Sequence, residues 1–429
     1  SFMVDSNTYA ITKYQDLNGN AVNGFYLPSE DTLYLIVENP DSDSFTIDSS
    51  VLSHELTHAL QDQYYGLFTG ELSYSTYDEQ MSVTALIEGE ALVVEDAISR
   101  QCQLGSWSCY NPNFQTQNPQ MEQNLKGMYY SLYFPYSEGK PYVSQLYTQN
   151  NGWSGVDSAF QNPPTHTSQI IHNGHKGVYK INFEKNVEST RWTEISAYSS
   201  QTNRVGEMGV FMMLWNHGDK FSQSEAFMPG ANKAQQAGSG FTYVSDATKG
   251  YLGDSIEFYQ SSDGETGYKW GLVTQDSESA TKLYNTYIIM LSEYGGSTQS
   301  NLSNENFKSE LGVTQDTTLE ALDQGKIIHL TDESGYGGEY TVLRNENQIY
   351  ITYTSNTESD YSELGPLTNT GFLSENGFDM TVVVEDSQAD SPTTETDENS
   401  TVQPLFDPKF NGIFLTIIIL ISFIYLLKD

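Results

Sequence analysis

The sequence predicts an α+β protein in which a mainly helical part is followed by a β-rich part and then by a transmembrane helix. Helix-like hydrophobic periodicity occurs at residues 49–65, 79–100, 121–134, 140–150, 204–217 and 278–294. Beyond residue 325, β-prone runs dominate, at 326–330, 340–344, 348–354 and 380–385. The third observation is the apolar run Gly412–Leu427, GIFLTIIILISFIYLL, which contains no charged residue.

These signals divide the chain into four parts: a mainly helical domain at 1–324, a β-rich part at 325–385, a disordered acidic stalk at 386–409 and a transmembrane helix at 410–428. The stalk is rich in Asp, Glu, Ser, Thr and Pro, so it cannot bury enough apolar surface to fold. The apolar run gives roughly 27 Å of helix, slightly less than the hydrocarbon thickness of about 30 Å. A cleaved C-terminal anchoring signal is the alternative to a membrane span.

Strong acidity limits the partners that the chain can have. Lys and Arg number 19 against 56 Asp and Glu, which gives a formal net charge of -37. This charge repels phosphate backbones and therefore argues against nucleic acid as a partner. The membrane helix and the acidic stalk instead predict a single-pass cell-surface protein whose N-terminal domain is extracellular.

Cys102 and Cys109 fit either a disulfide or two buried thiols, and their spacing does not decide between these.

A metal-binding pattern lies in the helix predicted at 49–65, which Asp48 would cap and Gly66 would end. His54 and His58 are four residues apart, so a helix places both imidazoles on one face as ligands of a single zinc ion. Glu55 would project beside the metal as the general base. Leu56 and Leu60 are expected to face the core. The alternative is a surface helix with two solvated histidines.

A third ligand is expected from the helix predicted at 79–100. Glu88 and Glu95 are seven residues apart and share a helix face, and we assign Glu88 to zinc and Glu95 to the orientation of a ligand imidazole. In the alternative assignment Glu88 is solvated and the ligand is Glu90, Glu95 or Asp96.

At these residues the chain resembles a known group of enzymes. HExxH followed by an EGxA glutamate is similar to the gluzincin metallopeptidases, in which the first Glu of EGxA completes the zinc site. HELTHALQDQ at 54–63 and ALIEGEA at 85–91 further resemble a prokaryotic surface-protein family that is well represented in archaea. PPTHTSQIIH at 163–172, RVGEMGV at 204–210 and YLGDSIEFY at 251–259 extend this resemblance, which covers about residues 20–295. The chain departs from the family at Asn173, where proline is usual. The resemblance implies a zincin-like catalytic domain and a surface location, but no substrate.

Peptide-bond hydrolysis also needs a donor for the developing oxyanion. His172 is the first choice, and the alternative is that it packs or caps locally. Tyr136, after the helix-breaking Pro135, is the second choice. The strand predicted at 32–37 would offer its edge to an extended peptide. The histidines without a patterned context are interpreted as structural: His166, His175, His217 and His329.

The sequence therefore predicts a membrane-anchored extracellular zinc metallopeptidase that acts on a peptide or protein substrate. The second hypothesis is a surface or adhesion protein that keeps a structural zinc and has no turnover. The two hypotheses differ at Glu55, because a structural zinc site has no use for a general base.

Overall fold

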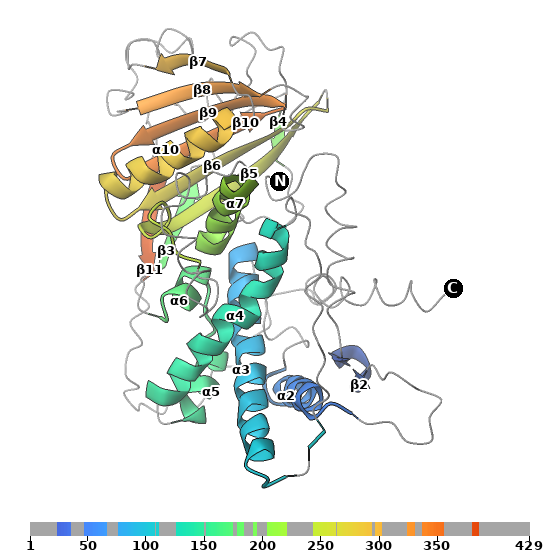
Figure 1. Ribbon diagram of the computed structural model, residues 1–429. Coiled ribbons are helices and arrows are strands. Elements are labelled where there is room, and N and C mark those ends of the chain that lie inside the picture. Colours follow the sequence, from blue (N-terminus) through green and yellow to red (C-terminus); the bar gives the residue numbers. More distant parts are fainter. Residues whose placement is uncertain are drawn as a thin grey trace, which may run out of the picture.

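The computed structural model of the chain places a group of helices beneath a large antiparallel sheet (Figure 1). It describes residues 24–35, 47–66, 76–107, 109–110, 126–149, 152–174, 178–183, 192–194, 204–220, 243–262, 264–293, 297–302, 324–330, 337–355 and 380–385. Within these residues the fold is α+β, as the sequence predicts. The stalk and membrane helix predicted at 386–428 lie outside the described residues. Among the helices of the described part, none is long and apolar enough to cross a membrane.

The helices are α2 (Ser49–Tyr65), α3 (Tyr77–Gln103), α4 (Lys126–Gln149), α5 (Trp153–Gln161), α6 (Thr167–Ile171), α7 (Gly206–Lys220) and α10 (Ser277–Glu293), with a 3-10 turn η1 at Pro28–Glu30. The strands are β1 (Gly24–Leu27), β2 (Thr32–Leu35), β3 (Val178–Phe183), β4 (Trp192–Glu194), β5 (Tyr251–Ser261), β6 (Thr266–Thr274), β7 (Ser297–Leu302), β8 (Gln324–Leu330), β9 (Gly338–Asn345), β10 (Gln348–Thr354) and β11 (Met380–Glu385).

The large sheet has the strand order β4-β5-β6-β10-β9-β8-β7, and every neighbouring pair is antiparallel. Helix α10 packs across it (Figure 1). Trp270, Ile351 and Val342 lie side by side on β6, β10 and β9 and are buried. The Trp270 ring lies 6.1 Å from that of Tyr287 on α10. Alternation along the strands thus directs an apolar face toward the helix.

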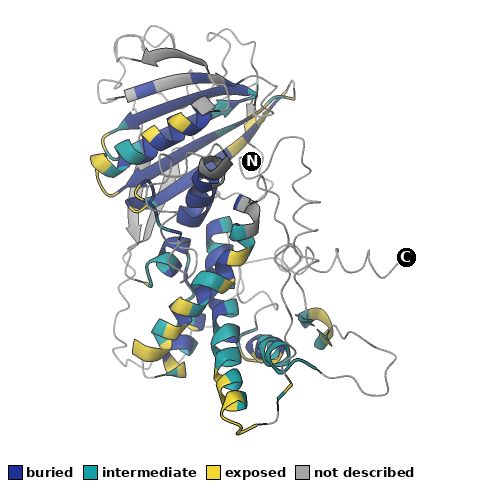
Figure 2. Ribbon diagram, in the orientation of Figure 1, coloured by how far each residue is buried: buried dark blue, intermediate teal, exposed yellow. Residues whose placement is uncertain are grey.

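Buried residues concentrate in this sheet and in α7, whereas α2 and the far end of α3 are only partly covered (Figure 2). The apolar core includes Phe211, Trp215, Tyr243 and Tyr251, all of which are almost completely buried. The core therefore lies between sheet and helices, away from the helix that carries the two predicted histidine ligands.

A buried polar joint connects the helices to the sheet. The Asp254 carboxylate on β5 accepts hydrogen bonds from the backbone N–H groups of Val205 and Gly206, at 2.8 and 2.9 Å, where α7 begins. The adjacent Arg204 side chain donates to Asp78 in the first turn of α3 at 2.7 Å. Both carboxylates are fully buried, so these charge-assisted bonds fix where α3 and α7 start relative to the sheet.

Two small residues let α3 and α4 pack closely. A methyl group at Gly89 would overlap the carbonyl group of Gly139, and one at Gly139 would overlap the carbonyl of Ala85.

Helix α4 runs without interruption through Pro135 and Pro141, so the two helices predicted at 121–134 and 140–150 are one. Proline removes one backbone donor and usually breaks a helix. Here the extensive contact with α3 holds the helix together.

The structure also departs from the expected placement of strands. Strands β5 and β6 lie before residue 325 and were not predicted, yet they are in the same sheet as β8, β9 and β10. The expected boundary at 324/325 thus falls at the start of β8, and this sheet has strands both before and after β8 in the sequence. A second error concerns α2, because Leu56 and Leu60 are 48% and 65% exposed instead of facing the core.

Candidate metal centre

The helix that carries the HExxH pattern has the bounds that its capping residues predict. The Asp48 carboxylate accepts a hydrogen bond from the Ser50 backbone N–H at 2.8 Å, and Gly66 ends the helix in the left-handed region at φ 64°. His54 and His58 consequently share one face of α2. That face lies against α3, which brings Glu88 to the same point.

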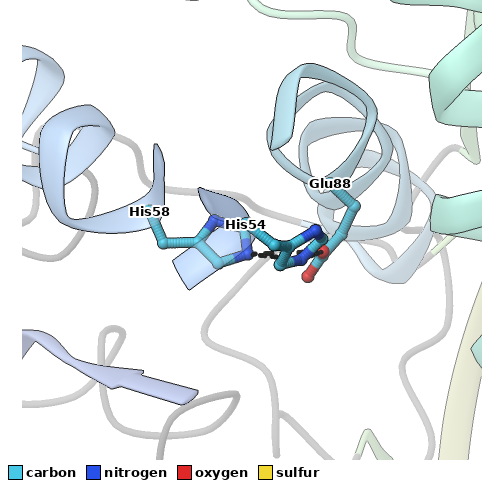
Figure 3. A group of neighbouring side chains, drawn as sticks. All are labelled: His54, His58 and Glu88. Atoms are coloured by element: carbon cyan, nitrogen blue, oxygen red, sulfur yellow. Dashed lines mark hydrogen bonds and ion pairs between the residues drawn. The ribbon is translucent and has the colours of Figure 1, made fainter. Parts of the chain in front are cut away.

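The donor atoms of these three residues form a compact triangle (Figure 3). The Nε2 atoms of His54 and His58 are 3.1 Å apart, and they lie 3.2 and 3.4 Å from Oε2 of Glu88. A tetrahedral zinc ion with bonds of about 2.0 to 2.1 Å separates its ligand atoms by about 3.3 Å. Two imidazole nitrogens and one carboxylate oxygen are also a ligand set of catalytic zinc sites. The triangle can therefore hold such an ion with little rearrangement.

The outer ring nitrogens of both histidines face oxygen acceptors. His58 Nδ1 lies 2.8 Å from Oε1 of Gln61, and His54 Nδ1 lies 3.5 Å from Oε2 of Glu95. If each Nδ1 carries its hydrogen toward that oxygen, both Nε2 lone pairs point at Glu88, which is the tautomer that a metal requires. Glu95 lies where the sequence predicted it. Gln61 was missed, although its position three residues after His58 places it on the same helix face.

The alternative third ligands have other partners. Gln61 donates from Nε2 to Oε2 of Glu90 at 2.8 Å, and Lys140 forms an ion pair with Asp96 at 2.8 Å. Among the described residues, the group of His, Cys, Asp and Glu side chains able to share an ion is His54, His58 and Glu88. The geometry thus favours Glu88 over Glu90, Glu95 and Asp96.

Electrostatics couple the three groups strongly. Burial disfavours the charged form of His54, but hydrogen bonds to Glu88 and Glu95 outweigh burial and raise its pKa to about 10. Burial likewise opposes protonation of His58, yet the charge of Glu88 raises its pKa. Burial alone would raise the pKa of Glu88. The two histidines outweigh burial and lower this pKa well below the usual range. Positive charge is therefore favoured at this point, and a metal cation would take the place of protons.

Glu55 is buried next to the two histidines, with 7% of its surface exposed. Burial raises the pKa of its carboxyl group, and the charges of His58 and His54 partly oppose that rise. The carboxylate also accepts a hydrogen bond from the backbone N–H of Tyr26 on β1. The strand that touches Glu55 is thus β1, whereas the strand predicted at 32–37 is its hairpin partner β2.

Comparisons with known proteins add little to this site. A family model for a domain of unknown function (DUF8575) matches residues 194–326. No curated protein and no solved structure matches the chain. The matched part runs from the end of β4 to the start of β8, so it contains Asp254 and the start of α7 but none of the three candidate metal ligands.

The two candidate oxyanion donors lie in different surroundings. His172 ends α6, and its Nε2 lies 3.0 and 3.1 Å from the carboxylate oxygens of the buried Glu207 on α7. Figure 1 shows α6 on the opposite side of α3 and α4 from α2. Tyr136 on α4, in contrast, has its ring 6.5 Å from that of His54, with an interplanar angle of 23°. The structure therefore brings Tyr136, and not His172, to the metal centre.

Proposed function

We propose that this protein is a zinc metallopeptidase that hydrolyses peptide bonds. One observation carries the proposal: the donor atoms of His54, His58 and Glu88 lie 3.1 to 3.4 Å apart beside the buried carboxyl group of Glu55. The gluzincin-like motifs HExxH and EGxA supply these same four residues, which supports the proposal from the sequence.

The residues of the site have two roles: some would hold the zinc ion, and Glu55 would transfer a proton. His54, His58 and Glu88 would hold the zinc, and Gln61 and Glu95 would keep the two imidazoles in the binding tautomer. Zinc in such a site supplies Lewis acidity, which polarises the scissile carbonyl and acidifies water. The Glu55 carboxylate would accept a proton from the attacking water and deliver it to the leaving amine.

A peptide fits the surroundings of the site better than a small molecule. The hairpin of β1 and β2 lies against α2, and its Tyr26 amide contacts Glu55. Within the described residues β1 and β2 pair only with each other, so this hairpin has an edge that can pair with the main chain of an extended substrate. Tyr136 is then the better placed candidate to donate a hydrogen bond to the substrate carbonyl.

A structural zinc site without turnover is the second candidate. Structural zinc is almost always held by four protein ligands, whereas catalytic zinc keeps one position open. The described residues offer three ligands, which favours a catalytic site over a structural one.

The proposed location follows from the sequence alone. We infer that a helix at 410–428 anchors the protein in the membrane and that the metal centre faces the outside of the cell. A chain truncated after Gln403 is then expected in the soluble fraction, while the full chain stays with the membranes. Retention of the truncated chain in the membranes would contradict the anchor.

Metal analysis combined with an unbiased peptide library tests the proposed activity. The purified protein should contain about one zinc per chain, cleave a subset of the peptides and lose both properties on His58→Ala. His172→Ala is the matched control, since it removes a histidine outside the cluster and should leave the zinc content unchanged. Full zinc occupancy in His58→Ala would disprove the ligand assignment.

A further inference from the structure

A disulfide lies in line with the metal ligands on α3. Glu88, Glu95 and Cys102 follow one another at intervals of seven residues, so they occupy one face of this helix. Glu88 and Glu95 contact the histidines of α2. Cys102, further along the same face, is bonded to Cys109. The disulfide is thus placed on the side of α3 that faces the metal helix.

Tyr110, the residue after Cys109, is hydrogen-bonded to the start of α2. Ser49 is the first residue of α2, and its backbone N–H donates to the carbonyl of Tyr110 at 2.9 Å. The Tyr110 N–H in turn donates to Oγ of Ser49 at 3.1 Å. First-turn N–H groups of a helix have no partner within the helix, so this pair of bonds satisfies one of them and ties the helix start to the loop.

The two ligand-bearing helices are therefore joined on both sides of the ligand cluster. On one side Gln61 donates to the carbonyl of Ile87 and to Glu90. On the other side the connection runs from Cys102 through Cys109 and Tyr110 to Ser49. The loop inside the disulfide contributes little burial of its own, because Leu104 and Trp107 are exposed. The stabilising effect of the disulfide is consequently directed at α2 and not at a core.

We propose that the Cys102–Cys109 disulfide, acting through the bonds between Tyr110 and Ser49, positions α2 for metal binding and raises the zinc affinity of the site. This inference rests on the zinc site of the proposed function. A ligand set that is already held in its binding geometry loses less conformational entropy when the ion binds. The disulfide persists in an oxidising exterior, so a reducing environment would leave a weaker site.

Two variants break the connection at different points. Cys102→Ser combined with Cys109→Ser removes the covalent bond without leaving thiols that would bind zinc. Ser49→Pro keeps the disulfide but removes both the N–H donor and the Oγ acceptor that Tyr110 uses. Proline is well tolerated at the first helical position, and Asp48 before it already has the extended backbone, φ -62° and ψ 119°, that a residue preceding proline needs. Leu104→Ser, an exposed loop change, is the control.

Zinc affinity, measured by competition with a chelator, should fall by about tenfold in Ser49→Pro and in the double cysteine variant, and stay unchanged in Leu104→Ser. Combining the changes should weaken binding no further than the cysteine changes alone, because both break one connection. Affinities within about twofold of wild type in both variants, or fully additive losses, would overturn the proposal.

Hydrogen exchange of the metal-free protein separates this proposal from that of the zinc site. Amides in the first turns of α2 should exchange at least about tenfold faster in both variants, while those of α10 stay unchanged. If the wild-type protein binds no zinc, the proposed function fails. The exchange rates alone then test whether the disulfide and Tyr110 position α2. Unchanged exchange in α2, or equally faster exchange in α10, would contradict it.

Discussion

The side chain of Gln61 accepts a hydrogen bond from His58 Nδ1 at 2.8 Å while its amide nitrogen donates to the carbonyl of Ile87 at 2.9 Å. One residue thus sets the orientation of a metal ligand and ties its helix to α3. Partners of this kind typically change metal affinity 10- to 100-fold when they are removed.

Gln61→Met should therefore weaken zinc binding by about 10- to 100-fold while leaving zinc stoichiometry at saturation unchanged. Methionine matches glutamine in length and lacks the acceptor that fixes the imidazole. Gln63→Met is the control, because Gln63 is exposed on the same helix. Calorimetric titration with zinc measures both affinities. Equal affinities in the two variants would show that Gln61 does not orient His58.

Zinc binding should release protons. Because the hydrogen bonds of His54 outweigh its burial and raise its pKa to about 10, this imidazole is protonated near neutral pH in the metal-free protein. A metal ligand must be neutral, so each bound zinc displaces at least one proton and affinity rises with pH through the neutral range. Calorimetry in buffers of different ionisation enthalpy counts these protons. An affinity that does not change between about pH 6 and pH 8 would contradict the coupling.

Gly89 is expected to resist substitution even though it lies inside a helix. Alanine has the higher helix propensity, by about 1 kcal/mol. At this position, however, its methyl group would overlap the backbone of Gly139 and push α4 away from α3. Gly89→Ala should lower the free energy of unfolding by about 1 to 3 kcal/mol, measured by chemical denaturation. A variant as stable as wild type would show that the helices can separate at no cost.

The sheet should carry a pH dependence of its own through Glu339 on β9. Burial raises the pKa of this carboxyl group to about 8. The folded state then binds a proton that the unfolded state releases above its ordinary pKa, so stability falls as pH rises from about 4.5 to about 8. Glu339→Gln should match wild type near pH 5 and be more stable near pH 8.5 in thermal unfolding. Identical pH profiles would refute this assignment.

Local signals explain which parts of the structure the sequence predicted. Asp48 and Gly66 mark the ends of α2, and the spacing of four residues was sufficient to place His54 and His58 on one face, because the helix is regular. Glu88 and Glu95 share a face of α3 for the same reason. These inferences need no knowledge of how distant segments pack, whereas the choice of Glu88 over its neighbours as the third ligand needed the contact between α2 and α3.

The parts that the sequence did not predict depend on tertiary contacts. Strands β5 and β6 contain the buried polar residues Asp254, Glu257 and Lys269, which hide the alternation of apolar and polar residues. The continuity of α4 through Pro141 depends on its packing against α3. The separation of His172 from the metal centre likewise follows from where α6 packs.

The most direct test of the metallopeptidase proposal is the cleavage rate of zinc-loaded Glu55→Gln. Glu55 touches the site without being a ligand, and glutamine keeps its shape while removing its basicity. The variant should retain about one zinc per chain, whereas peptide cleavage should fall by at least about 100-fold, in keeping with the contribution of general acid–base catalysis. Cleavage at the wild-type rate by the zinc-loaded variant would show that Glu55 is not the base, and a zinc-loaded wild-type protein that cleaves no peptide of a broad library would contradict the proposal itself.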